Sequence, residues 1–160
     1  MAIPDFHDLV VTRLQVVFSG LTGIRRAFKE HPTMALWDYP SLYPVSAKMT
    51  SPTDRKLVVE RAYVYRLAVA PMQAASMDAG DYGAEALNAV YPVLYRVHEY
   101  LSENPRLETT SLAPLSHLDA DVRWQDTGAI GFTAPGGELF AGAEITLHIA
   151  MRWQDAVRLS

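Results

Sequence analysis

The sequence predicts an α+β fold in which a mainly antiparallel β-sheet is packed by two principal helices. Three observations support this fold class. Residues 57–71 form a run of β-branched and aromatic residues, which is typical of a strand. Residues 4–21 and 82–103 repeat apolar side chains at helical spacing, and residues from 118 onward alternate apolar and polar side chains around glycine turns. A chain of 160 residues fits one domain, so we expect residues 1–160 to fold as one unit.

Composition narrows the class of protein. Apolar residues make up 49% of the chain and charged residues 20%, which favours a globular fold over disorder. The net charge of −4 argues against a dedicated nucleic-acid surface, because such surfaces cluster lysine and arginine. The chain has no cysteine and therefore neither a disulfide nor a thiolate metal site. We expect no signal peptide and no membrane span, because neither a basic leader nor a long apolar run is visible.

The first helix is expected over residues 4–21. Its apolar side chains recur at spacings of three and four: Phe6, Val10, Leu14, Val17 and Leu21. Gly20 and Gly23 end the helix, and residues 24–28 are expected to form a short strand.

Residues 29–56 are predicted to form a long, proline-rich projecting loop, because four prolines at this density disfavour both helix and ladder. Long loops in compact domains are commonly functional. Aromatic side chains are enriched in contact hot spots, so we expect part of this loop to pack against a neighbouring subunit or another protein. The alternative is that these aromatic side chains fold back on their own domain. The predicted interface residues are Trp37, Tyr39, Leu42, Tyr43 and Val45.

Residues 57–70 are expected to be the central strand, which Pro71 ends. Successive side chains in a strand point to opposite faces, and here both faces are at least half apolar. The large residues suit a core. The small residues on the other face would allow a helix or a neighbouring subunit to approach closely.

The second helix is expected near residues 82–103, with a kink at Pro92. His98 lies in its apolar stripe, and we interpret it as a hydrogen-bonded core histidine because no second metal ligand accompanies it. The side chains predicted to be largely buried in the common core are Leu67, Leu94, Leu147 and Ile149.

A β-meander is expected from Leu118 onward, after a possible short strand at residues 107–112. Its strands are 120–125, 129–134 and 139–153, joined by turns at 126–128 and 135–137. Turn-length connections imply antiparallel pairing. The tetrapeptide Arg-Trp-Gln-Asp occurs at both 123–126 and 152–155, which chance or a shared role at strand ends explains.

No catalytic, cofactor-binding or metal-binding constellation is found in the sequence, so no enzyme is predicted and no cofactor is expected. The five histidines have no metal-ligand spacing, and the serines lie in no nucleophile elbow. The segment GFTAPGGELFAG lacks the Lys-Ser/Thr pair of a phosphate loop, so its glycines indicate hairpin turns. Asp119 and Asp121 share a strand face, which a solvated edge explains.

The order of elements over nearly the whole chain resembles the tail terminator family of long-tailed bacteriophages. The resemblance rests on Leu21-Thr22-Gly23-Ile24, the loop LWDYPSLYPV and the strand RAYVYRLAVAP. It also rests on the helix GAEALNAVYPVLYRVHEYL and on the final segment GGELFAGAEITLHIAMRW. These are shared elements and lengths, because the family has no sharp motif and no active site to carry over.

The resemblance implies a structural virion protein that forms a homohexameric ring. Such a ring caps the finished tail tube and joins it to a head-side neck protein, at the top of the virion tail. It implies assembly in the host cytoplasm, and passage of genomic DNA through the ring without specific binding. An acidic chain suits that role, because it repels phosphates. Two alternatives stay open: a small-ligand-binding or enzymatic α+β domain with its site under residues 29–56, and another phage neck or head-completion protein.

Overall fold

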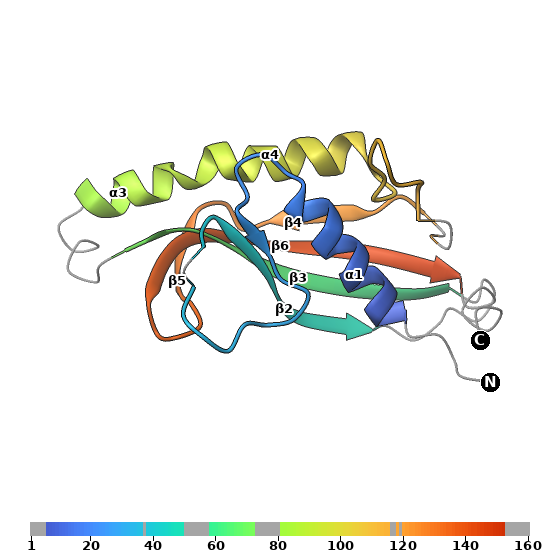
Figure 1. The fold of residues 1–160 in the computed structure, drawn as a ribbon, viewed down its shortest axis with the longest axis horizontal. Helices are drawn as coiled ribbons and strands as arrows, with labels where there is room; N and C mark the ends of the chain where they lie inside the picture. Colours follow the sequence, from blue (N-terminus) through green and yellow to red (C-terminus); the bar gives the residue numbers. More distant parts are fainter. Residues whose placement is uncertain are drawn as a thin grey trace.

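The computed structural model describes residues 6–36, 38–49, 58–72, 81–115, 118 and 120–152. Within these residues, three helices and six strands follow one another along the chain (Figure 1). The helices are α1 (Phe6–Ser19), α3 (Asp81–Asn88) and α4 (Val90–Glu103). The strands are β1 (Arg26–Ala27), β2 (Ser41–Met49), β3 (Val58–Pro71), β4 (Arg123–Asp126), β5 (Ile130–Thr133) and β6 (Leu139–Arg152).

All six strands belong to one sheet with the order β1-β2-β3-β6-β4, and β5 also pairs with β6. The two-residue strand β1 runs parallel to β2, whereas every other pairing is antiparallel. The predicted α+β fold with a mainly antiparallel sheet is therefore confirmed. The predicted central strand is also confirmed, since β3 lies between β2 and β6.

Part of the predicted projecting loop is instead strand β2. Residues 29–36 and 38–40 contain no helix or strand, but Ser41–Met49 pairs with β3 along its whole length. β1 pairs only with the first two residues of β2, so among the described residues the outer side of β2 is unpaired beyond Leu42. Pro44 fits there because its missing amide hydrogen is tolerated at the edge of a sheet. A β-bulge at Val45 follows the proline. Residues 50–56 of the predicted loop lie outside the described part.

The predicted meander is wrong in one respect. β4 and β5 do not pair with each other; both pair with β6, one after the other along the same side. Between them, residues 127–129 lie opposite residues 143–144, so the expected turn is a bulge that lets the chain continue in its original direction. Gly128 supplies the positive φ of 71° that this bulge requires.

The predicted second helix is divided into α3 and α4 at Ala89. Pro92 has no amide hydrogen and its ring clashes with the carbonyl four residues earlier, at Asn88, so the break falls one turn before the proline. The disruption expected from Pro92 is therefore present, as an interruption of the helix at Ala89. The short strand expected at residues 107–112 does not form: turns occupy that segment, and Thr109 exchanges two backbone hydrogen bonds with Leu112.

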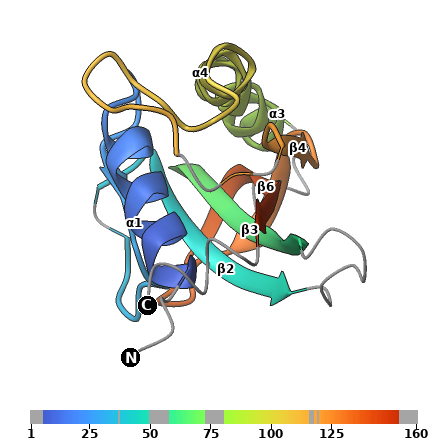
Figure 2. The same ribbon diagram turned by 90° about the vertical axis from the view of Figure 1, so that its right-hand side faces the viewer.

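The main core lies between one face of the sheet and the helices, which all lie on the same side of the sheet (Figure 2). From α1 the core receives Val10, Leu14 and Phe18, whose ring packs edge-on against Tyr65 of β3. The four side chains predicted to be buried are at most 1% exposed, which confirms their placement: Leu67, Leu94, Leu147 and Ile149.

Candidate functional site

The five predicted interface residues do not form one exposed surface. Leu42 and Tyr43 have no exposed area, because β2 places them on opposite faces of the sheet, each inside a hydrophobic cluster of its own chain. Their assignment to an exposed loop was wrong. Tyr39 and Val45 are only partly buried, so their role in an interface stays a prediction, while Trp37 lies outside the described residues.

Tyr43 belongs to a second, smaller core on the face of the sheet opposite the helices. Tyr39 packs edge-on against Phe140 in this core, with ring centroids 5.4 Å apart. Burial raises the pKa of the Tyr43 hydroxyl, and the nearby Arg66 guanidinium partly opposes that shift. The cluster comprises Leu36, Tyr43, Ala68, Phe132, Ala134 and Phe140. Tyr39 and Tyr43 therefore pack within their own domain, as the alternative interpretation of the sequence expected for the aromatic side chains of this segment.

An open groove of about 290 Å³ lies beside the outer half of β2. His7 enters it from α1, with its ring stacked on Tyr63 at a centroid distance of 5.8 Å. Lys29, whose Nζ lies 2.5 Å from an Asp8 carboxylate oxygen, also lines the groove. Among the described residues, the lining consists of His7, Lys29, Glu30, His31, Pro44, Val45, Ser46, Ala47 and Tyr63. The groove therefore combines an apolar floor with two imidazoles at one edge of the sheet.

A row of aromatic rings occupies the opposite edge, where α4 crosses β4. Tyr91 and Tyr95 are 6.2 Å apart, Tyr95 and His98 are 5.9 Å apart, and His98 packs on Trp124 at 4.6 Å, measured between ring centroids. Tyr95 is 60% exposed and Tyr91 39%, so the outer end of the row faces solvent. We call Tyr91, Tyr95, His98 and Trp124 the aromatic row.

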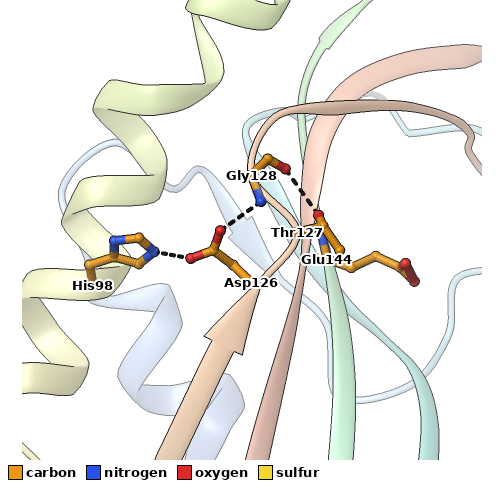
Figure 3. A network of polar contacts seen from close by, with 5 residues as sticks. All are labelled: His98, Asp126, Thr127, Gly128 and Glu144. Carbon is orange, nitrogen blue, oxygen red and sulfur yellow. Dashed lines mark hydrogen bonds and ion pairs between the residues drawn. The ribbon is translucent and has the colours of Figure 1, made fainter.

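The inner end of the aromatic row is held by a polar network (Figure 3). The Nε2 atom of His98 lies 2.5 Å from Oδ2 of Asp126, and Oδ1 of the same carboxylate accepts a hydrogen bond from the amide of Gly128 at 2.7 Å. Thr127 Oγ1 accepts a hydrogen bond from the amide of Glu144 at 3.0 Å. The network joins α4 to the β4–β5 bulge and fixes the orientation of the His98 ring. The prediction that His98 is hydrogen-bonded is confirmed.

The face of the sheet away from the helices carries charged pairs. Arg123 of β4 donates a hydrogen bond to Glu60 of β3 at 3.1 Å, and Nδ1 of His148 lies 3.6 Å from the same carboxylate oxygen. Arg66 and Glu144 pair at 3.5 Å. Small side chains such as Ala62 lie half-buried between these pairs. That a helix or a neighbouring subunit approaches this face closely, as the alternation in β3 suggested, stays a prediction.

Sequence reasoning missed both edge features. The groove joins α1, residues 29–31 and β2, which are distant in sequence, and no local pattern marks it. The aromatic row is partly visible as Tyr91, Tyr95 and His98 at helical spacing, but Trp124 and Asp126 complete it from another strand. Among the residues that the structure describes, no three histidine or acidic side chains cluster as metal ligands would.

Comparison with known proteins adds no family assignment, since no family model and no curated protein matches this chain. Within the described segments, no helix is both long and apolar enough to cross a lipid bilayer.

Proposed function

We propose that this protein is a structural component of a phage tail, a tail terminator that forms a homohexameric ring. The ring caps the tail tube and connects it to a head-side neck protein, and it is assembled in the host cytoplasm before it becomes part of the virion. The proposal rests on the order of elements that resembles this family, and it is supported by the properties of the sheet edges.

The observation that carries the proposal is that the sheet is open at two chemically different ends. Beyond Leu42, β2 has no outer partner among the described residues, and neither does β4 at the other end of the sheet. A monomer with two different, unpaired edges can join copies head to tail, and such contacts close into a ring when the rotation permits. An exposed edge presents unpaired N–H and C=O groups with which a strand of another chain can pair.

The charge of the chain agrees with this role. Each copy carries a net charge of −4, so a ring of identical copies repels the phosphates of DNA that passes through it. Neither the ring nor its passage for DNA requires a catalytic residue, a cofactor or a metal.

Imaging the purified protein with and without purified tail tubes tests this function. We expect rings of uniform diameter that seat on one end of the tube, and a solution mass or tube-bound mass equal to six chains. A protein that stays monomeric in solution and leaves both tube ends bare contradicts the proposal.

The groove beside β2 favours a second candidate function, that of a small-ligand-binding or enzymatic domain. The sequence placed the site of this alternative under residues 29–56, and the groove is lined partly by residues of that segment. Its two imidazoles and apolar floor suit a small aromatic or anionic molecule. Saturable binding of a small molecule to a monomer, abolished by filling the groove with Ala47→Trp, would favour this candidate over the ring.

A further inference from the structure

We propose that, in the ring, the exposed end of the aromatic row of one copy inserts into the groove beside β2 of the next copy. This inference rests on the proposed ring and assigns its contact surface. The occupant of the groove is Tyr95, with Tyr91 beside it, from a second copy of this chain.

The two features lie at opposite ends of the sheet, as a head-to-tail contact requires. The groove is lined by β2, near the β1 end of the strand order, and the aromatic row is fixed to β4 at the other end. Both features involve the helix-bearing side of the sheet: His7 of α1 lines the groove, and the two tyrosines project from α4. Two copies in the same orientation therefore bring one feature toward the other.

The strand directions also agree with this contact. β2 and β6 run in one direction, and β3 and β4 run in the other, because each neighbouring pair in this series is antiparallel. When a second copy in the same orientation follows β4, its β2 runs antiparallel to β4. Antiparallel pairing is the slightly more stable arrangement per residue.

Tyr95 has the properties of an interface anchor. Tyrosine is enriched in contact hot spots, and its ring loses few rotamers on binding. The 60% exposed ring packs edge-on against His98, which the Asp126 carboxylate holds in place. The anchor is therefore oriented before the partner arrives, which lowers the entropic cost of binding.

The groove offers a matching surface. Pro44, Val45 and Ala47 present apolar area, and the imidazoles of His7 and His31 provide flat rings for stacking against an aromatic side chain. Its volume of about 290 Å³ lies near the lower end of the range for ligand pockets, which suits one inserted side chain better than a large ligand.

Charges around the two features are complementary. The exposed carboxylates of α3 and α4 outnumber the exposed cations there: Glu85, Glu99 and Glu103 stand against Arg96. The segment that leads into the groove has the opposite balance, with Arg25, Arg26 and Lys29 against Glu30. Arg26 and Lys29 also pair with Asp38 and Asp8 of the same chain, so the complementarity rests chiefly on Arg25. Opposite charges at the rim of a contact fix its register and accelerate association.

Because the chain has no cysteine, introduced thiols test this contact without background. The variant carries Ser46→Cys at the groove and Glu99→Cys one helical turn beyond Tyr95, both at exposed positions that leave the anchor intact. A short bifunctional maleimide should convert it into a ladder of covalent oligomers that ends at six chains. Each single-cysteine variant should give dimers at most, because the contact joins two different positions.

Two matched controls define the result. The pair Ser46→Cys and Glu138→Cys places the second thiol on the exposed β5–β6 turn, which lies beside Ala35, and should give no ladder. Adding Tyr95→Ala to the informative pair should weaken assembly by at least about tenfold, as expected for a hot-spot residue, whereas Val16→Ala, at an exposed apolar position on α1, should not.

Wild-type rings that show no ladder with the informative pair, or an equal ladder with the Glu138 pair, would overturn this contact and leave the proposed function standing. A ladder unaffected by Tyr95→Ala would also overturn the role of the anchor, provided that the thermal midpoint shows the variant to be folded. A wild-type chain that forms no ring, either alone or on tail tubes, would remove the proposed function and this inference together.

Discussion

Replacing Gly142 with alanine should severely destabilise the fold, because no space exists for a Cβ atom at this position of β6. An added Cβ would lie 1.7 Å from the carbonyl oxygen of Leu67 on β3 and 2.8 Å from Cε1 of the Phe132 ring. A carbon and an oxygen in contact are ordinarily about 3.3–3.6 Å apart, so the two strands would have to separate by well over 1 Å. The nearer obstacle is backbone and cannot rotate away.

The cost follows from what that separation disrupts. Overpacking a core costs about 1–3 kcal/mol, and each backbone hydrogen bond lost between β3 and β6 adds about 1 kcal/mol. We therefore expect Gly142→Ala to lower the free energy of unfolding by about 2–4 kcal/mol, measured by urea denaturation with the slope checked against wild type. Gly20→Ala is the control, because its nearest neighbours lie at an ordinary 3.6 Å. Equal midpoints for the two variants would refute the close approach of the central strands.

Three further changes test the core and the polar network. Leu94→Ala should cost about 2–5 kcal/mol of unfolding free energy, the usual range for a buried leucine, and an unchanged denaturation midpoint would show that the helix face is misassigned. Burial raises the pKa of Tyr65, so its contribution to stability is complete below the unfolded-state pKa of about 10 and is lost as the pH rises above it. The hydroxyl of Tyr65 has no hydrogen-bond partner in the described part, so Tyr65→Phe should be neutral or stabilising at pH 7. The variant should also lose less unfolding free energy than wild type at alkaline pH, and an equal loss would contradict this. Asp126→Ala should lower the unfolding free energy by roughly 1–3 kcal/mol, because it leaves His98 and the Gly128 amide without their acceptor. The control Asp121→Ala, which breaks an exposed pair with Arg106, should lower it by at most about 1 kcal/mol. Equal losses for the two variants would show that the polar network contributes little.

Local patterns in the sequence predicted most of the fold. The alternation around Leu67 identified the central strand and its buried face, and the spacing around Leu94 identified the buried face of α4. Pro92 marked the helix break because its effect on the preceding turn is purely local. These features depend on residues within one element, so the sequence alone contains them.

The errors arose where pairing between distant segments decides the structure. Pro44 disfavours a strand by local rules, yet it fits at the sheet edge, where its missing amide hydrogen is tolerated beside the bulge at Val45. Asp126-Thr127-Gly128 has the composition of a turn, but hydrogen bonds between Thr127 and Glu144 of β6 keep the chain in its original direction. The groove and the aromatic row were beyond prediction for the same reason, since each is assembled from separate elements.

The most direct test of the central claim is electron microscopy of purified tail tubes incubated with the wild-type protein, together with the mass of the material bound at their ends. We expect a six-membered ring at one end of each tube, and its loss from the tubes with Tyr95→Ala but not with Val16→Ala. Tube ends that stay bare at saturating wild-type protein would contradict the proposed function.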